Sequence, residues 1–167
     1  MIVTTSRDPS AGTRRFARTL ASFLSLPYVN RGKSSVGEGE PGEAALVVVE
    51  DHGNPSGIIK RTSGREERLY FRLSGQLAAG RMKKRAATVC GERGIARPVA
   101  SFFELQWLGE SAPDPATRPA GRQTQDEGLP RAKESAAAIA VPSRNIIVAP
   151  GCIDFIDEGA VRFRLKI

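Results

Sequence analysis

The chain has 167 residues, a length that suits one domain or two small halves that share a core. A hydrophobic content of 40% supports such a core, and the net charge of +7 favours a polyanionic partner, with nucleic acid ahead of an anionic membrane. The two cysteines lie far apart and outside any CxxC pair, which excludes a disulfide scaffold and a cysteine-rich zinc site and indicates a reducing compartment.

The first 33 residues predict a strand, a basic helix, a short second strand (SLPYVN) and a basic turn. The first strand covers residues 1–6, and Ser10 is a good N-cap for a helix that ends at Ser25. The apolar residues of this helix form one stripe, and Arg14 and Arg18 lie opposite it. These two arginines have no acid four residues away, so either water or an external anion completes this face of the helix.

The middle of the chain predicts a buried strand and a hairpin. An acidic, glycine-rich segment (residues 34–43) precedes the strand AALVVVE, and a turn covers residues 51–56. The runs GIIKRTS and ERLYFRLSG then predict two paired strands around a turn. In the second run the apolar residues share one face. The opposite face, Arg68, Tyr70 and Arg72, is either solvated or a surface on which a single strand stacks.

The C-terminal part predicts a helix, a long loop and three strands. The densest basic cluster, RMKKR at residues 81–85, is expected in a surface loop or at a helix edge. Pro98 suits the first turn of an apolar helix that runs through Trp107. Residues 109–131 predict a loop, and residues 133–141 a short alanine-rich helix. The runs NIIVAP, CIDFID and AVRFRLKI predict three strands, with a hairpin turn between the last two.

The charge is unevenly distributed along the chain. Residues 1–35 carry a net charge of +5, residues 36–51 carry −5, residues 60–97 carry +8 and residues 98–167 carry −1. Arginine outnumbers lysine by nineteen to six. Guanidinium groups bind phosphate through paired hydrogen bonds and stack on bases, although genome composition or a hot habitat would produce the same bias. The segregation of charge predicts a localised basic surface.

Motifs that would indicate catalysis are missing from the sequence or stand in the wrong context. The segment Gly37–Gly42 matches G-x-G-x-x-G but precedes a strand instead of following one, so we reject it as a dinucleotide fingerprint. The single histidine, His52, cannot build a histidine-based triad or a multi-histidine metal site on one chain. Cys90 has basic neighbours in the sequence that could lower its pKa, but no partner base is evident. We therefore expect no catalytic residue, no metal and no cofactor.

Several short motifs follow one another along the chain: Thr4-Thr5-Ser6-Arg7-Asp8-Pro9-Ser10, Arg14-Arg15-Phe16-Ala17, Leu26-Pro27, Asn30-Arg31-Gly32-Lys33, Gly53-Asn54-Pro55 and Val161-Arg162-Phe163-Arg164-Leu165-Lys166-Ile167. Taken in this order, they resemble the Brix family. The matches lie at both ends of the chain, so the resemblance covers nearly all of it, and the N-terminal block is the more specific. The chain looks like a minimal Brix domain close to the small-subunit-processome branch, and its brevity suggests an archaeal version.

This resemblance implies a ribosome-biogenesis factor that binds pre-rRNA without catalysis and assists its folding, its processing or its pairing with a guide RNA. It implies an α/β fold of two similar halves, each a mixed β-sheet with packed helices that resembles the anticodon-binding domain of class IIa aminoacyl-tRNA synthetases. We expect residues 1–167 to form a single Brix domain, with an N-terminal half of about 1–80 and a C-terminal half of about 90–167. Other ribosome-assembly proteins would be partners, and the oligomeric state is open.

The expected location is cytoplasmic for an archaeal protein and nucleolar for a eukaryotic one. No run approaches the ~20 apolar residues of a membrane span, and the first residues form a strand rather than a signal peptide, so we expect a soluble intracellular protein without a membrane partner.

The predicted RNA-binding residues fall into two groups, and two other functions compete with RNA binding. One is a protein-interaction scaffold in a pre-ribosomal complex, with residues 37–51 and the Trp107 helix as partner surfaces. The other is an RNA-processing enzyme. The first group of predicted phosphate contacts is Arg7, Arg14, Arg15, Arg18, Arg31 and Lys33, and the second is Arg81, Lys83, Lys84 and Arg85.

Overall fold

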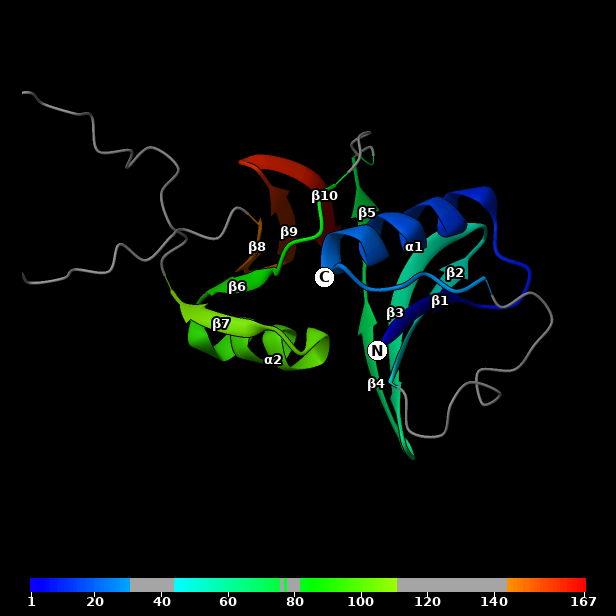
Figure 1. Ribbon diagram of the computed structural model, residues 1–167, viewed down its shortest axis with the longest axis horizontal. Helices are drawn as coiled ribbons and strands as arrows, with labels where there is room; N and C mark the ends of the chain where they lie inside the picture. Colours follow the sequence, from blue (N-terminus) through cyan, green and yellow to red (C-terminus); the bar gives the residue numbers. More distant parts are fainter. Residues whose placement is uncertain (31–43, 76, 78–81, 111–143) are drawn as a thin grey trace, which may run out of the picture.

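The computed structural model describes residues 1–30, 44–75, 77, 82–110 and 144–167, which form two sheets and two helices (Figure 1). The first sheet has the order β1-β2-β3-β4, formed by Ile2–Thr5, Ala45–Asp51, Asn54–Thr62 and Arg65–Tyr70. The second has the order β5-β10-β9-β8-β6-β7; in chain order these strands are Arg72–Ser74, Thr88–Gly91, Gln106–Gly109, Arg144–Ala149, Cys152–Asp157 and Ala160–Lys166. The helices are α1 (Ala11–Leu24) and α2 (Arg93–Phe103). Within the described ranges, neither helix has the length and apolar character needed to cross a membrane.

The two sheets repeat one arrangement. In the first, β1 leads into α1, and the chain then returns beside β1 as a single parallel bridge between Val3 and Tyr28. β2 pairs in parallel with β1, and β3 and β4 follow antiparallel. In the second, β6 leads into α2, β7 returns parallel to β6, and β8 pairs in parallel with β6 before β9 and β10 follow antiparallel. Each helix therefore occupies the same place in its half.

One extended segment contributes to both sheets. β4 pairs with β3 in the first sheet, and β5, after a single intervening residue, pairs with β10 in the second. The intervening residue, Phe71, is buried, and its amide donates a hydrogen bond to the Ser56 carbonyl at 2.9 Å. This segment passes directly from one sheet into the other, so the two sheets are joined through the backbone as well as by packing.

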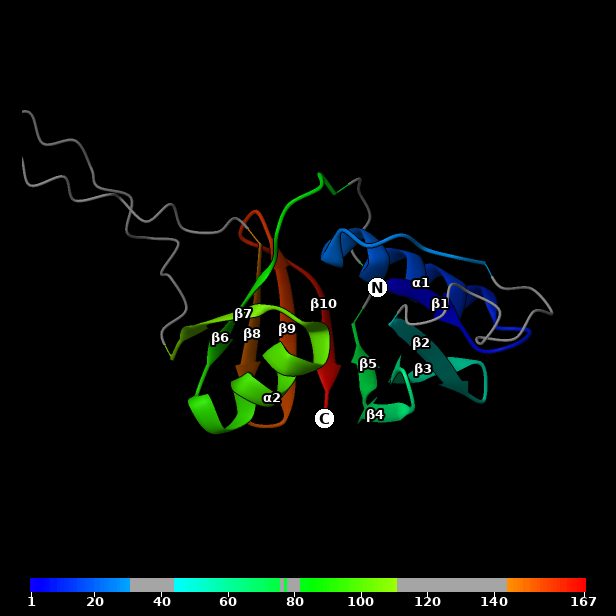
Figure 2. The same ribbon diagram turned by 60° about the horizontal axis from the view of Figure 1, so that its bottom comes forward.

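The sheets share one hydrophobic core, and α1 packs against both of them. Phe16 contacts Phe71 with ring centroids 5.4 Å apart and Phe163 of β10 at 5.5 Å. Phe23, two turns further along α1, contacts Phe155 of β9 at 5.1 Å. Burial of each such side chain contributes roughly 1.5–3 kcal/mol. Helix α2 packs on the β6–β8 region of the second sheet, as both ribbon views show (Figure 2).

Most elements predicted from the sequence are confirmed. Helix α1, strands β1 and β2, the β3–β4 hairpin and the three C-terminal strands lie where their patterns predict them. The single strand predicted for ERLYFRLSG is instead divided at Phe71 into β4 and β5, which belong to different sheets. The short strand predicted for SLPYVN is reduced to the bridge at Tyr28. The turn predicted for residues 51–56 is tighter, because His52 and Gly53 adopt positive φ angles of 47° and 79° and Asn54 already begins β3.

The second helix begins earlier and ends sooner than predicted. Pro98 lies inside α2, which starts at Arg93 after the N-cap Glu92, so the prediction that Pro98 occupies the first turn is wrong. Trp107 lies in β7 and not in the helix, because Glu104 adopts a left-handed conformation (φ 55°) that ends α2. The sequence did not predict β6 or β7, which have only four residues each.

Three sequence-based predictions fall outside the described residues. They concern the acidic, glycine-rich segment 34–43, nearly all of the loop predicted for 109–131, and the alanine-rich helix predicted for 133–141.

Candidate nucleic-acid interface

Helix α1 has a fixed start and a buried apolar stripe, which together direct its arginines to solvent. The Ser10 hydroxyl oxygen accepts a hydrogen bond from the Thr13 amide at 3.1 Å, and the Ser10 amide donates to the Glu50 carboxylate of β2 at 2.9 Å. A hydrogen bond from the Thr13 side chain, hydrogen bonds from Ser10 and the charge of Arg14 hold the pKa of Glu50 below its ordinary value. These contacts attach the N-terminus of α1 to β2.

A groove follows the exposed side of α1. Two cavities of about 430 and 830 Å³ share Ser22 and Met82 in their walls and therefore adjoin; we call the two together the basic groove. The first cavity lies along the arginines of α1, and the second lies between the C-terminal end of α1 and the segment 82–84 that precedes β6. The charged side chains that line the basic groove are Arg14, Arg15, Arg18, Lys83 and Lys84.

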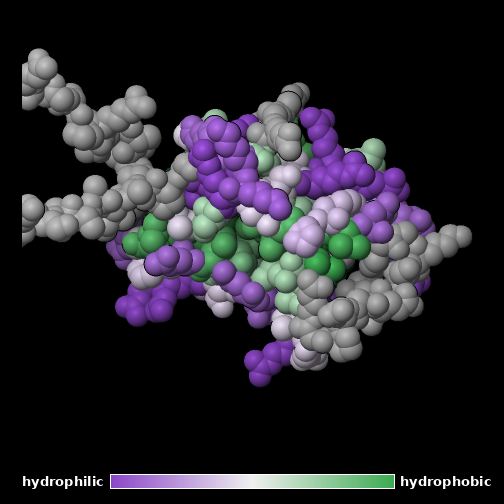
Figure 3. Space-filling model, in the orientation of Figure 1, coloured by the Kyte–Doolittle hydropathy of each residue, from purple (hydrophilic) through white to green (hydrophobic). Residues whose placement is uncertain are grey.

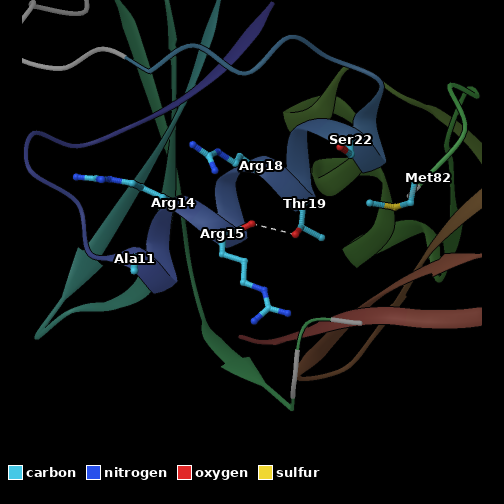
Figure 4. Close-up of a pocket in the computed structure, with 7 residues that line it drawn as sticks. All are labelled: Ala11, Arg14, Arg15, Arg18, Thr19, Ser22 and Met82. Atoms are coloured by element: carbon cyan, nitrogen blue, oxygen red, sulfur yellow. Dashed lines mark hydrogen bonds between the residues drawn. The ribbon is translucent and has the colours of Figure 1, made fainter. Parts of the chain in front are cut away.

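The three arginines fan out from α1, and Met82 approaches the helix beside Ser22 (Figure 4). The space-filling view shows hydrophilic side chains gathered over α1 (Figure 3). The Arg18 guanidinium lies over the Tyr28 ring at 5.5 Å from its centroid, which is a cation–π contact. Among the described residues these arginines make no ion pair within 4.0 Å, so their charge is available to an external anion.

The segment that carries Lys83 and Lys84 is attached to the end of α1. Ser25 is the C-cap of α1, in a left-handed conformation, and its hydroxyl donates a hydrogen bond to the Arg85 carbonyl at 2.8 Å. The Arg85 amide in turn donates to the Ser25 hydroxyl oxygen at 3.0 Å. Residues that are 60 positions apart in the sequence are therefore held side by side, which places both lysines at the groove.

Arg144 is the residue that holds this arrangement together. Its side chain is fully buried, and its Nε donates to the Asp157 carboxylate at 2.9 Å. Its Nη1 donates to the Phe23 carbonyl at 2.8 Å, and its Nη2 donates to the Lys83 carbonyl at 2.6 Å. A cation at the C-terminus of a helix interacts favourably with the helix dipole and with the carbonyls that have no partner within the helix. Arg144 of the second half thus caps the helix of the first and fixes the groove wall.

Lys60 of β3 makes the reciprocal contact with α2. Its ammonium group donates to the Ser101 carbonyl at 3.2 Å and pairs with Glu104 at 3.0 Å, at the C-terminal end of α2. Each helix therefore ends on a buried cation that the opposite half supplies. Sequence analysis missed both residues, because lysine and arginine are rarely buried and nothing in the local sequence indicates their distant backbone partners.

The structure brings together five of the ten predicted phosphate-binding residues. These are the three arginines of α1 with Lys83 and Lys84. Arg7 is exposed in the loop before α1 but does not line the groove. Arg85 is half-buried and pairs with Glu158 at 3.1 Å, so its side chain is already engaged. Arg31, Lys33 and Arg81 lie outside the described residues.

The other reactive side chains that the structure describes include Cys90 and His52 and the acidic residues around them. Burial raises the pKa of the Cys90 thiol, which makes it a poorer nucleophile at neutral pH. His52 is exposed in the β2–β3 turn, with Asp51 at 3.7 Å. Among residues 1–30, 44–75, 77, 82–110 and 144–167, no group of three or more histidine, cysteine, aspartate or glutamate side chains is placed to hold a metal ion.

The fold is shared with solved archaeal proteins of one class. The crystal structure of Mil, an archaeal Imp4-like protein, superimposes with a TM-score of 0.63 at 24% identity, covering 100% of this chain and 96% of that one. The ribosomal biogenesis protein of Aeropyrum pernix K1, described as probable, gives a TM-score of 0.54 at 17% identity, covering 99% and 92% of the two chains. The mixed α/β fold with two sheets and two helices is thus the fold of Imp4-like ribosomal biogenesis proteins.

Curated archaeal sequences are also similar to the chain. A Methanosarcina mazei protein is 26% identical over 100% of this chain and 96% of its own length, and one from Methanothermobacter thermautotrophicus is 33% identical over 53% of this chain and 60% of its own length. One from Methanococcoides burtonii is 40% identical over 44% of this chain and 50% of its own length. All three are named probable Brix domain-containing ribosomal biogenesis proteins. No family model matches the chain.

The chain is therefore a relative of archaeal Brix domain-containing ribosomal biogenesis proteins, as its motifs indicate. The alignments with the Methanothermobacter and Methanococcoides relatives span about half of each protein, whereas the alignment with the Methanosarcina relative spans nearly all of it.

Proposed function

We propose that the chain is a non-catalytic ribosome-assembly factor that binds pre-rRNA in the basic groove and assists its folding, its processing or its pairing with a guide RNA. The observation that carries this proposal is that Arg14, Arg15, Arg18, Lys83 and Lys84 all line the two adjoining cavities of the basic groove. Neutralisation of phosphates there would lower the repulsion between two RNA strands, so that they can fold or pair. Other ribosome-assembly proteins would be its partners.

The proposal treats residues 1–167 as a single Brix domain, with halves of about 1–80 and about 90–167. The shared core supports a single domain, and the two reciprocal caps, each reaching from one half to the helix of the other, support its composition of two halves. The repeated order of strand, helix and parallel strand supports the likeness of each half to the anticodon-binding domain of class IIa aminoacyl-tRNA synthetases. In such a domain the basic groove would lie where the two halves meet.

Salt dependence tests the proposal directly. If the five groove cations each contact one phosphate of a single-stranded region, the affinity for pre-rRNA fragments should fall with a log–log slope of roughly −3.5, about −0.7 for each phosphate. Arg14→Glu with Arg18→Glu should abolish most of this binding. The matched control, Arg65→Glu with Lys166→Glu, makes the same change in net charge at exposed positions on β4 and β10 and should bind more tightly than the groove variant. Binding that ignores salt, or equal losses in both variants, would refute the proposal.

A further inference from the structure

The two helices are related by an internal repeat in the sequence as well as in the fold. Residues 12–29 (GTRRFARTLASFLSLPYV) align without gaps with residues 91–108 (GERGIARPVASFFELQWL), and eight of the eighteen positions are identical. The structure supports this alignment, because each helix ends in a left-handed C-cap, Ser25 or Glu104. The cap amides bond to equivalent carbonyls, of Ala21 and Ser22 in α1 and of Ala100 and Ser101 in α2.

The repeat includes the arginines. Arg14 and Arg18 of α1 align with Arg93 and Arg97 of α2, and Tyr28 aligns with Trp107. The Arg97 guanidinium lies over the Trp107 ring at 5.7 Å from its centroid, just as Arg18 lies over Tyr28 at 5.5 Å. Both halves therefore build the same constellation: two arginines one turn apart, with the second placed over an aromatic side chain beside the first strand of the half.

The equivalent surface on α2 is accessible and not neutralised. Arg93 and Arg97 are exposed, and within the described part of the chain neither makes an ion pair. Trp107 is half-buried and fixed by a hydrogen bond from its indole nitrogen to the Gly91 carbonyl at 3.1 Å. The exposed Arg97 guanidinium thus lies over an aromatic side chain that is itself held in place.

We infer that α2 carries a second RNA-binding surface, formed by Arg93, Arg97 and Trp107, which binds single-stranded RNA by phosphate contact and by stacking of a base on the Arg97–Trp107 pair. This inference rests on the proposed function and extends it from one groove to two surfaces on one molecule. Single-stranded RNA is the occupant that fits, because unpaired bases stack on aromatic rings and arginine planes while the adjacent phosphates bind guanidinium groups. Two linked contacts on one RNA strand also raise the affinity beyond that of either alone.

Trp107 provides a direct reporter, because it is the only tryptophan of the chain. Full-length protein is titrated with a labelled uridine oligoribonucleotide, and binding is followed by anisotropy of the label and by tryptophan emission. We expect the emission to change in step with binding, since a base stacks against the Arg97–Trp107 pair. Saturated binding that leaves the emission of Trp107 unaltered would overturn the inference.

Charge-removal variants separate the two surfaces. Arg93→Gln with Arg97→Gln should lower the magnitude of the salt slope by about 1.4, weaken binding roughly 25-fold at 0.1 M salt and remove the change in tryptophan emission. Arg14→Gln with Arg18→Gln should weaken binding similarly but keep the change in emission at saturation. The control, Arg65→Gln with Lys166→Gln, should neither weaken binding to this extent nor remove the change in tryptophan emission. Unaltered midpoints of thermal unfolding show that the variants fold.

The failures of the two ideas are distinguishable. If the α2 variant binds as the control does while the α1 variant loses binding, the second surface is refuted and the basic groove stands. If the wild-type protein shows no salt-dependent binding, the proposed function fails, and this inference fails with it.

Discussion

The outer faces of α1 and α2 carry the same pair of arginines and the same arginine–aromatic contact, but their surroundings differ. The α1 face borders the basic groove, because Ser25 and Arg144 hold the segment with Lys83 and Lys84 beside it. On the α2 face, Gly94 stands where α1 has Arg15, and the equivalent buried cap is Lys60. The same repeat thus places five cations at the groove beside α1, whereas the corresponding described face of α2 carries the arginine pair Arg93 and Arg97.

The largest expected effect comes from the two reciprocal caps. Arg144→Met leaves Asp157 buried beside the half-buried Arg162 alone and removes the donors at the end of α1, so it should lower the free energy of unfolding by about 3–5 kcal/mol. Lys60→Met should cost about 1–2 kcal/mol, because its partner Glu104 is half exposed to solvent and remains hydrated. Urea denaturation measures both, and equal losses would contradict the asymmetry.

A pair of aligned glycines gives the next largest difference. A Cβ on Gly91 would lie 2.3 Å from the Val148 carbonyl oxygen, and its φ of 137° is strained for any other residue, so Gly91→Ala should destabilise the protein by roughly 2–4 kcal/mol. Gly12 is helical, and its nearest contact would be 3.9 Å away, so Gly12→Ala should be neutral or stabilising by up to about 1 kcal/mol. Thermal unfolding of the two variants checks the opposite signs.

The two basic faces differ at one aligned position, which is Arg15 in α1 and Gly94 in α2, and a substitution there can make either face resemble the other. Gly94→Arg adds the missing arginine to α2, where a Cβ meets nothing closer than the Glu92 carboxylate at 3.9 Å. It should strengthen RNA binding roughly fivefold at 0.1 M salt and steepen the salt slope by about 0.7. Arg15→Gln should weaken binding by the same factor. A Gly94→Arg variant that binds no more tightly than wild type would indicate that α2 does not contact RNA.

The smallest expected effect concerns pH and the start of α1. The pKa of Glu50 is lowered in the folded protein, so its contribution to stability is present above its ordinary pKa of about 4.5 and is lost as the pH falls through the lowered value. Glu50→Gln should therefore reduce stability at pH 7 and flatten the decline between about pH 5 and pH 3. Glu92→Gln is the control, since no side chain caps the N-terminus of α2. A wild-type decline that persists unchanged in Glu50→Gln would contradict this role.

The sequence predicted elements whose signals are local. The Ser10 cap, the apolar stripe of α1 and the alternation of the C-terminal strands each depend on residues a few positions apart, and each was located correctly. The predicted start of α2 is wrong because proline usually favours the first turn of a helix, whereas Pro98 lies in the interior of α2. The repeat that relates the helices is also present in the sequence itself, as the fixed offset that aligns Arg14 with Arg93 and Arg18 with Arg97.

The assembly of the candidate site could not be predicted from local patterns. The two basic clusters converge because Ser25 bonds to Arg85 and Arg144 bonds to both α1 and the Lys83 carbonyl. These contacts join residues that lie about 60 and 120 positions apart, and their acceptors are backbone carbonyls that no side-chain motif reports. Charge segregation predicted that a basic surface exists, but only the fold places its members.

The extended segment that passes from β4 into β5 has a consequence for how the molecule opens. Its amides bond to β3 on one side of Phe71 and to β10 on the other, so neither sheet can lose this segment without exposing the ring that seals the core. Native-state hydrogen exchange should therefore show the central amides of both sheets opening together, with one common free energy equal to that of global unfolding. A protein that opens only in this all-or-none way would keep its two basic faces at a constant separation. An RNA strand that contacts both faces would then have to span one fixed distance.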